Sequence, residues 1–221
     1  MKQQLNFISS LHTATKREYL PRMNDNKVEA MTIAKKYGFD YWDGDRRYGY
    51  GGYKYIPGRW KPVAEKLIQQ YHLPPKAKIL DVGCGKAYLL FELQKLLPDA
   101  EVTGFDLSSY AINNAKEEVK PFLFVHRAED KLPYHDQEFD LVLSINTLHN
   151  LPLYDVNKAL QEIERVGKNK YLVVESYRNE QELFNLQCWA LTAESFFTPQ
   201  EWVWLLQTCG YSGDYEFIYF Q

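Results

Sequence analysis

A glycine turn and a later carboxylate are the residues of this chain whose spacing indicates chemistry most clearly. The apolar run "KILDV" leads directly into the turn Gly83, Cys84, Gly85 and then into a segment with helical spacing. Glycines at such a turn let the backbone approach a ligand closely, and the helix that follows presents N–H groups without partners. A second apolar run ends in Asp106, 21 residues after Gly85, a spacing that lets a carboxylate reach the hydroxyls of a bound ribose. Together these residues predict a site for a nucleoside cofactor.

The glycine pattern argues against a dinucleotide as that cofactor. A dinucleotide site needs the motif G-x-G-x-x-G, and Tyr88 stands where the third glycine is required. An NAD(P)-dependent oxidoreductase on a Rossmann-like fold is therefore an alternative that this position disfavours.

The residues around these motifs predict short strands that alternate with helices. The expected strands are "KILDVG", "EVTGFD", "FLFVHR", "FDLVLSIN", "KYLVVES" and "YEFIYF". Because parallel neighbours can be joined only through a crossover, the alternation predicts an α/β fold: a doubly wound, mostly parallel sheet with helices on both faces. Ligands bind such sheets beyond the carboxyl ends of the strands.

Residues 1–60 differ in composition from the core expected over residues 61–221. Capping residues and apolar spacing predict a helix from about 24 to 38, and a second helix is expected over roughly 60–72. Between these helices lies "RRYGYGGYKY", residues 46–55, whose glycines and tyrosines are typical either of an inert linker or of a lid over a site.

Charge, hydropathy and cysteine content exclude several classes of protein. With 26 basic and 29 acidic residues the chain has no overall positive field that would hold a nucleic acid. The N-terminus lacks the apolar centre of a signal peptide, and no apolar window is long enough to span a membrane. Three separated cysteines fit neither a disulfide framework nor a zinc site. We expect a cytoplasmic protein with a small-molecule substrate, no metal, no membrane and no nucleic-acid partner, either monomeric or homodimeric.

Four segments in sequence order resemble the class I S-adenosylmethionine-dependent methyltransferases, which have a Rossmann-like fold. They are "ILDVGCGKAYLLFEL", "VTGFDLSSYAINNAKE", "RAEDKLPYHDQEFDLVLSINTLHNL" and "KYLVVES", and the resemblance continues through "FTPQEWVWLLQTCGY". The resemblance implies methyl transfer from S-adenosyl-L-methionine, with S-adenosyl-L-homocysteine as the product. It leaves the acceptor and the presence of a seventh strand open.

The resemblance also implies which residues contact the cofactor. Asp81 and the glycine turn would line its methionine and ribose, Asp106 would bind the ribose hydroxyls, and Leu107 would pack on the adenine. An acidic side chain after the third strand would reach the adenine amino group, with Glu129 and Asp130 both open. The expected contacts are Asp81, Gly83, Cys84, Gly85, Asp106, Leu107, Ala128, Glu129, Asp130, Asn146 and Tyr53. Lys86 would either pair with the methionine carboxylate or point to solvent.

Asn146 and His149 follow the fourth strand and are the expected catalytic residues. The unperturbed pKa of a histidine lies near working pH, so His149 could be a general base, although a histidine that bonds to its own loop fits equally well. The residues expected to bind substrate are Arg46, Arg47, Tyr48, Tyr50, Arg59, Glu175, Tyr177 and Arg178. The other histidines, His12, His72, His126 and His135, are expected to lie outside this site.

In the family that this chain resembles, the segment before the first strand commonly covers the cofactor. We therefore interpret residues 46–55 as a lid, because aromatic faces suit a cationic sulfonium. The expected reaction is methylation of an oxygen or nitrogen of a small polar molecule. The arginines suit a phosphate or carboxylate, and resemblance to a bacterial subgroup of surface-polysaccharide pathways points to a phosphorylated or nucleotide-linked sugar. The alternative from another class is a non-catalytic module that binds S-adenosylmethionine.

Overall fold

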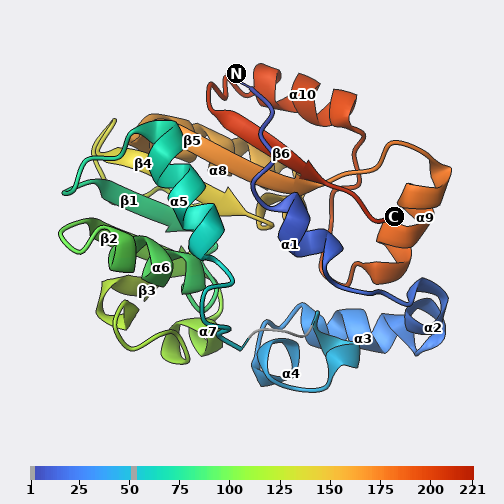
Figure 1. The fold of residues 1–221 in the computed structure, drawn as a ribbon. Helices are drawn as coiled ribbons and strands as arrows, with labels where there is room; N and C mark the ends of the chain where they lie inside the picture. The colour runs from blue at the N-terminus through green and yellow to red at the C-terminus, as the bar shows by residue number, and fades with distance from the viewer. Residues whose placement is uncertain (1–2, 51–53) are drawn as a thin grey trace.

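Six parallel strands form one sheet in the computed structural model, which describes residues 3–50 and 54–221 (Figure 1). The strands are β1 Lys78–Val82, β2 Glu101–Asp106, β3 Leu123–Val125, β4 Phe139–Ile145, β5 Gly167–Glu175 and β6 Asp214–Ile218. Their order is β3-β2-β1-β4-β5-β6, and each neighbouring pair is parallel. The chain builds outward from β1 and then returns to β4 on the other side of β1, so the switch point for ligand binding lies between these two strands. The predicted α/β fold is confirmed.

Helices cover both faces of the sheet. They are α5 Lys61–Tyr71, α6 Tyr88–Leu96, α7 Ser109–Asn113, α8 Leu153–Val166, α9 Glu180–Trp189 and α10 Pro199–Thr208, with the 3-10 turns η2 Lys120–Phe122 and η3 Leu148–Asn150. The start of α10 shows why the sequence folds this way: Thr198 Oγ1 accepts from the Glu201 N–H, and the Glu201 carboxylate accepts from the Thr198 N–H. Helix α9 was not predicted from the sequence.

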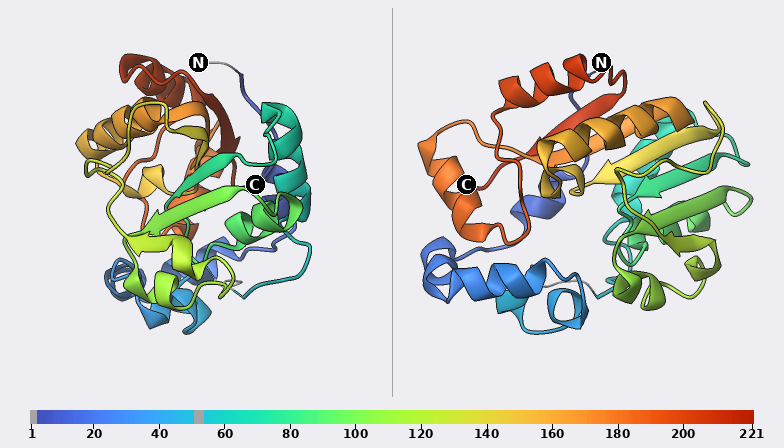
Figure 2. Two further views of the ribbon diagram at one scale, coloured as in Figure 1. Left: turned by 90° about the vertical axis from the view of Figure 1, so that its left-hand side faces the viewer. Right: turned by 180° about the vertical axis from the view of Figure 1, so that it is seen from behind.

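Successive residues of a strand pack into two separate hydrophobic cores, one on each face of the sheet. Ile79 packs with α5 and α6, whereas its neighbour Leu80 packs with α8 and α10. Leu172 and Val173 of β5 divide in the same way, because successive side chains of a strand point to opposite faces. The back view in Figure 2 shows α8 lying over the face opposite to α5.

The N-terminal segment forms α1 Ser9–Thr13, α2 Tyr19–Asn24, α3 Lys27–Ala34, α4 Phe39–Trp42 and the 3-10 turn η1 Arg46–Tyr48. The single helix predicted over about 24–38 is thus shorter, and the expected loop that follows it contains α4. Figures 1 and 2 show α2, α3 and α4 on the side toward which the strands point, where a site is expected.

The first described residues are fastened to the last strand of the sheet. Glu216 of β6 is only 1% exposed and accepts hydrogen bonds from the backbone N–H groups of Phe7, Ile8 and Ser9 at 2.6, 3.0 and 2.8 Å. N–H groups at the start of a helix lack partners within it, so a carboxylate there stabilises α1. This contact holds the start of α1 against β6, and from α1 the chain continues to α2.

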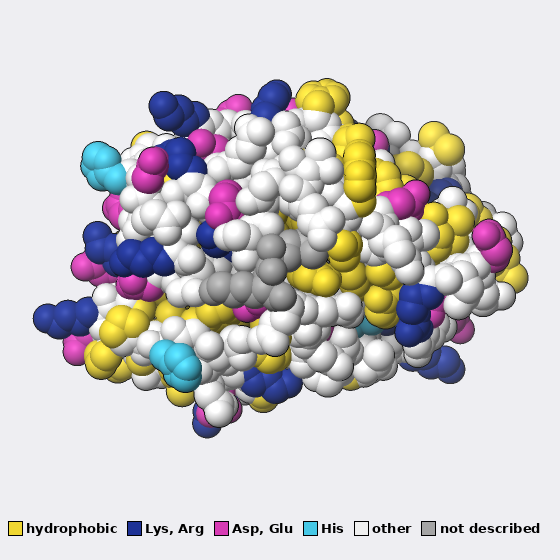
Figure 3. All heavy atoms as spheres, turned by 90° about the horizontal axis from the view of Figure 1, so that it is seen from above, with side chains coloured by type: hydrophobic (Ala, Val, Ile, Leu, Met, Phe, Trp, Pro, Cys, Tyr) yellow, Lys and Arg dark blue, Asp and Glu magenta, His cyan; other side chains and the backbone are white. Residues whose placement is uncertain are grey.

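Charges of both signs are mixed on the surface. On the face shown in Figure 3, the basic and acidic side chains of the described residues lie interspersed. In the part of the chain that the structure describes, no helix is long and apolar enough to cross a membrane.

Candidate active site

A cavity of about 540 Å³ lies at the carboxyl ends of β1, β2, β4 and β5. Each of these strands contributes to its wall near its end, through Asp81, Asp106, Ile145 and Glu175 respectively. The N-terminal segment supplies the other side of the cavity, with residues from α1 to Tyr50. The cavity therefore sits at the switch point of the sheet and under the N-terminal helices.

The glycine turn after β1 is held to the end of β2. Gly83 and Gly85 have φ angles of 78° and 55°, in the left-handed region that glycine adopts without strain. The Gly85 N–H donates to Asp106 Oδ2 at 2.9 Å, and the Ser108 N–H donates to Asp106 Oδ1 at 2.8 Å. These bonds fix the Asp106 carboxylate beside the turn, in the wall of the cavity.

Asp81 is the acidic group deepest in this end of the cavity. It is 5% exposed, and its Oδ1 has no hydrogen-bond partner among the described residues. Burial, with a smaller contribution from the Asp106 charge, raises the pKa of Asp81 to about 7. Buried polar atoms normally have partners, so the orphaned oxygen fits a ligand that donates hydrogen bonds, as an ammonium or a ribose does.

The next part of the wall fits a flat apolar ring. Leu107 is 40% exposed, and it lines the cavity together with Ala128 and Glu129. Asp130 is exposed and outside the cavity wall, so position favours Glu129 of the two acidic candidates. His126 also lines the cavity, and its Nε2 is buried without a partner among the described residues; its expected place outside the site was wrong.

Residues 37–43, which we call the cover, are fastened over the glycine turn. Trp42 Nε1 donates to Ser108 Oγ at 2.9 Å, and the Trp42 ring would lie 2.8 Å from a Cβ placed on Gly85. Lys86 is 6% exposed, and its Nζ lies 2.6 Å from both carboxylate oxygens of Asp43. Lys86 thus does not point to solvent, which corrects that expectation; a contact with the methionine carboxylate stays a prediction and would require Lys86 to leave Asp43.

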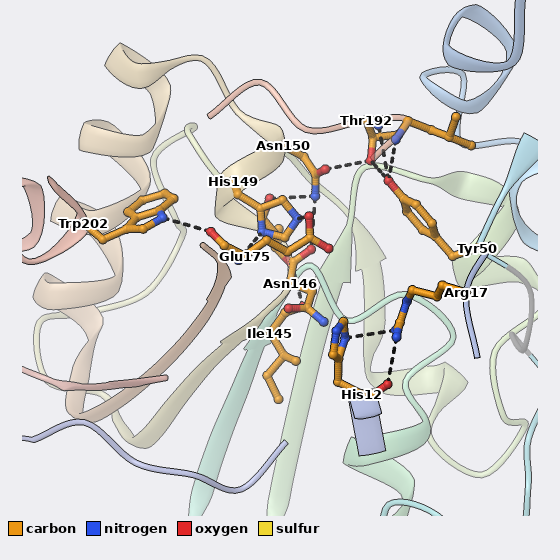
Figure 4. Close-up of polar contacts among 12 residues, drawn as sticks. His12, Arg17, Tyr50, Ile145, Asn146, His149, Asn150, Glu175, Thr192 and Trp202 are labelled. Carbon is orange, nitrogen blue, oxygen red and sulfur yellow. Dashed lines mark hydrogen bonds and ion pairs between the residues drawn. The ribbon is translucent and has the colours of Figure 1, made fainter. Parts of the chain in front are cut away.

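His149 lies in the cavity wall, buried against Glu175. It is 3% exposed, its Nδ1 accepts the Glu175 N–H at 3.3 Å, and its Nε2 lies 3.4 Å from Glu175 Oε2 (Figure 4). Burial lowers the pKa of His149 to about 3, so the ring is neutral and the Nδ1 contact assigns its proton to Nε2. The role of His149 as a general base stays a prediction, and these contacts weaken it. Asn146 is exposed in the cavity wall with a φ of 56°.

Glu175 ends β5 and faces this part of the cavity. Its Oε2 is buried and makes no hydrogen bond with the described residues, although His149 Nε2 lies 3.4 Å away; the backbone carbonyl of Glu175 accepts from Trp202 Nε1 at 3.0 Å. Burial raises the pKa of Glu175 to about 7, and the charge of Arg17 opposes that shift. A carboxylate with such a pKa can accept a proton near neutral pH.

Arg17 and His12 complete the wall, although no sequence motif places either of them in the site. His12 Nε2 donates to the Tyr219 carbonyl at 3.1 Å, and its Nδ1 accepts from Arg17 Nη2 at 3.1 Å. Burial, reinforced by the Arg17 charge, lowers the pKa of His12 to about 4. His12 thus lies in the cavity wall, contrary to the expectation, and no local pattern revealed this, because the carbonyl to which its ring donates belongs to Tyr219, 207 positions away.

The residues expected to bind substrate separate into two groups. Tyr50 and Glu175 line the cavity, and Tyr50 Oη accepts from the Leu191 N–H at 2.9 Å. The others lie outside its wall: Arg46 and Arg47 border a separate surface depression, Arg59 is exposed, Arg178 pairs with Glu182, and Tyr48 and Tyr177 pack in hydrophobic clusters. Tyr53 lies outside the described residues. No metal-binding group of three or more His, Cys, Asp or Glu side chains occurs within residues 3–50 and 54–221.

Comparison with known proteins assigns the central part of the chain. A family model described as a methyltransferase domain matches residues 73–210. A fatty-acid O-methyltransferase of Mycolicibacterium smegmatis is 31% identical over 129 residues, which cover 52% of this chain and 46% of that protein. A mitochondrial arginine-hydroxylase of Mus musculus is 30% identical over 116 residues, covering 52% of this chain and 33% of that protein. The chain therefore spans less than half the length of these relatives.

A solved structure shares the fold. A candidate methyltransferase from Bacillus halodurans C-125 superimposes with a TM-score of 0.54 at 20% identity, over 66% of this chain and 68% of that one. At this identity the likeness concerns the fold alone.

Proposed function

This chain belongs to the methyltransferase domain family, and we propose that it transfers a methyl group from S-adenosylmethionine to an oxygen or nitrogen of a small polar molecule. The family match and the six-stranded parallel sheet confirm the predicted class I methyltransferase fold, and S-adenosylmethionine is the cofactor that this family implies. The observation that carries the proposal is the orphaned, buried oxygen of Asp81, which lies beside the glycine turn in the cavity.

The residues present fit this cofactor. Asp81 and Asp106 would accept hydrogen bonds from its ammonium and ribose groups, and Leu107 would pack against its adenine, with Glu129 nearby. When bound, S-adenosylmethionine supplies a methyl group that is already electrophilic because it is attached to a sulfonium. The protein's share of the chemistry is therefore to hold the acceptor about 3 Å away and in line, to exclude water and to receive a proton.

Exclusion of water falls to the N-terminal segment. We assign the closing role to the cover, residues 37–43, together with Tyr50 of the segment 46–55, since Trp42 and Tyr50 both line the cavity. The division into an N-terminal extension over residues 1–60 and a core over residues 61–221 is part of this proposal.

The finer proposal, a phosphorylated or nucleotide-linked sugar of a surface-polysaccharide pathway, has weaker support. It rests on the sequence resemblance, and the arginines expected to hold a phosphate, Arg46, Arg47 and Arg59, are outside the cavity wall. An NAD(P)-dependent oxidoreductase is disfavoured by Tyr88 in place of the third glycine. A non-catalytic module that binds S-adenosylmethionine would have no use for Glu175, a cavity carboxylate that can accept a proton near neutral pH.

Calorimetry with S-adenosylmethionine, S-adenosylhomocysteine and NAD tests the proposal. We expect the first two to bind and NAD not to bind. The Asp106→Ala variant should weaken binding by about tenfold or more, because charge-assisted hydrogen bonds are each worth roughly 1.5–3 kcal/mol. Asp130→Ala, outside the cavity, is the matched control and should bind as the wild type does. Binding of NAD in preference to S-adenosylmethionine would refute the assignment.

A further inference from the structure

Two buried atoms of opposite charge lack hydrogen bonds at the end of the cavity away from the glycine turn. They are Arg17 Nε and Glu175 Oε2. Neither makes a hydrogen bond with the described residues, although His149 Nε2 lies 3.4 Å from Glu175 Oε2. Both side chains line the same cavity. Because buried polar atoms are nearly always paired, Arg17 Nε indicates a ligand contact, and the cavity gives the Glu175 carboxylate access to the same ligand.

The two groups interact electrostatically without bonding through these atoms. The Arg17 charge lowers the pKa of Glu175 against the effect of burial, so the guanidinium lies close enough to act on the carboxylate. The two side chains do not bond to each other, and both line the cavity, so a molecule in the cavity can contact both. Figure 4 shows Arg17, Glu175, Asn146 and Tyr50 brought together from different parts of the chain.

Arg17 is held in place before any ligand binds. Its Nη1 donates to the carbonyls of His12 and Thr15 at 3.0 Å each, and its Nη2 donates to His12 Nδ1. The guanidinium also packs against the rings of Trp189 and Phe220, at 5.4 and 5.3 Å from their centroids. A guanidinium fixed in this way loses little entropy when it binds a planar or tetrahedral anion.

Glu175 is also fixed, by the end of β5 and by His149 behind it. The Glu175 N–H donates to His149 Nδ1, and the Trp202 indole holds the Glu175 carbonyl. His149 therefore acts as a positioning residue for Glu175, and the carboxylate is the group that a bound molecule meets.

We propose that this end of the cavity is the acceptor subsite, where Arg17 binds an anionic group of the acceptor and Glu175 accepts a hydrogen bond from the hydroxyl or amine to be methylated. The inference rests on the proposed methyl transfer and names its substrate class. As the acceptor oxygen or nitrogen bonds to the methyl carbon and the methyl–sulfur bond breaks, the acceptor proton passes to the Glu175 carboxylate. The anionic group is a carboxylate or a phosphate, since the guanidinium fork matches both.

Binding of small aromatic probes to the complex with S-adenosylhomocysteine tests the subsite by calorimetry. The probes are benzoate, its 2-, 3- and 4-hydroxy isomers, phenyl phosphate and phenol. Benzoate or phenyl phosphate should bind at least about tenfold more tightly than phenol, as one charge-assisted pair would give. The tighter of the two identifies the anion as carboxylate or phosphate. Phenol binding as tightly as both anions overturns the proposal without any variant.

Variants then assign the effect to single residues. Arg17→Met should weaken binding of the preferred anion about tenfold and leave the affinity for phenol unchanged. Arg59 is exposed and outside the cavity, so Arg59→Met should change neither affinity. Arg17→Lys, which keeps the charge but loses the fork, should lose part of the affinity and serves if Arg17→Met does not fold. Anion affinity that is unchanged in a folded Arg17 variant overturns the proposal.

The Glu175 contact has its own measurement. The hydroxybenzoate that binds best should bind the wild type more tightly than benzoate does, and Glu175→Gln should reduce this difference in affinity. The role of Glu175 is contradicted if the wild type shows no difference or if the variant keeps the full difference. Binding of S-adenosylhomocysteine is recorded in the same titrations. Its failure would count against the proposed methyl transfer, while anion binding that depends on Arg17 would still support the subsite.

Discussion

The two ends of the cavity are built in different ways. The end at the glycine turn is made by consecutive strand and loop segments, from Asp81 through Asp106 to Glu129. The end at Glu175 is assembled from segments far apart in the sequence, including Arg17, Tyr50 and Thr192. The walls of the first end therefore depend on local turns, over which the cover, residues 37–43, is fastened, whereas the second end depends on how residues 12–17 of the N-terminal segment are held to the sheet. We expect changes at one end to leave the function of the other largely intact.

The largest expected effect separates chemistry at the Glu175 end from cofactor binding at the other. Glu175→Gln should lower turnover on the order of 10²–10⁴-fold, because a general base is lost, while binding of S-adenosylhomocysteine stays close to that of the wild type. In the wild type, turnover should rise with pH through about 7, where Glu175 loses its proton, and then level off. Steady-state rates and calorimetry check both statements. A parallel loss of rate and cofactor affinity would mean that the two ends are not separate.

Replacement of Asp81 at the cofactor end should raise the stability of the fold and weaken cofactor binding. The pKa of Asp81 in the folded protein is raised from 3.8 to about 7, so its ionisation destabilises the fold as pH rises from about 4 to 7. Asp81→Asn removes that cost, and at pH 8 it should stabilise the ligand-free protein by up to about 4 kcal/mol, at about 1.4 kcal/mol per pKa unit. The same variant should weaken S-adenosylmethionine binding. Urea unfolding at pH 4 and pH 8 measures the effect, which should be close to zero at pH 4, near the unfolded-state pKa of 3.8, and largest at pH 8.

Loss of the Glu216 carboxylate should affect the acceptor end more than the cofactor end. Glu216→Gln leaves the N–H groups of Phe7, Ile8 and Ser9 with fewer acceptors, so the variant should be about 3 kcal/mol less stable. Hydrogen exchange should rise across residues 5–17, because α1 is no longer held to β6, and probe binding at Arg17 should weaken. Equal exchange in α1 and in the glycine turn would contradict the comparison.

The smallest expected effect concerns the cover over the glycine turn. Asp43→Asn leaves the buried Lys86 ammonium with a weaker partner, and a double-mutant cycle with Lys86→Met should give a coupling of about 1 kcal/mol. Cofactor dissociation should become faster in Asp43→Asn, because the cover opens more readily. A coupling near zero would show that the pair does not hold the cover closed.

The comparison also explains what the sequence could predict. Gly83, Gly85 and Asp106 belong to one strand–turn–helix unit and the strand that follows it, so the short spacing between them in the sequence predicts that they lie together. The fold around them was predicted strand by strand. Glu175 was found because it ends a recognisable strand. His12 bonds to Tyr219, and Arg17, besides its local bonds to His12 and Thr15, packs against Trp189 and Phe220; no short-range pattern encodes these distant contacts. Lys86 was misjudged for the same reason, because its partner Asp43 lies 43 residues away.

The order in which the chain is synthesised gives the bond between His12 and Tyr219 a further consequence. These residues are 207 positions apart, so the bond can form only after β6 and Tyr219 have been synthesised. A domain generally folds as a unit, and the segments that line the Glu175 end of the cavity run from His12 to Phe220. The acceptor end is therefore completed late in synthesis, although Arg17 is among the first of its residues to be made.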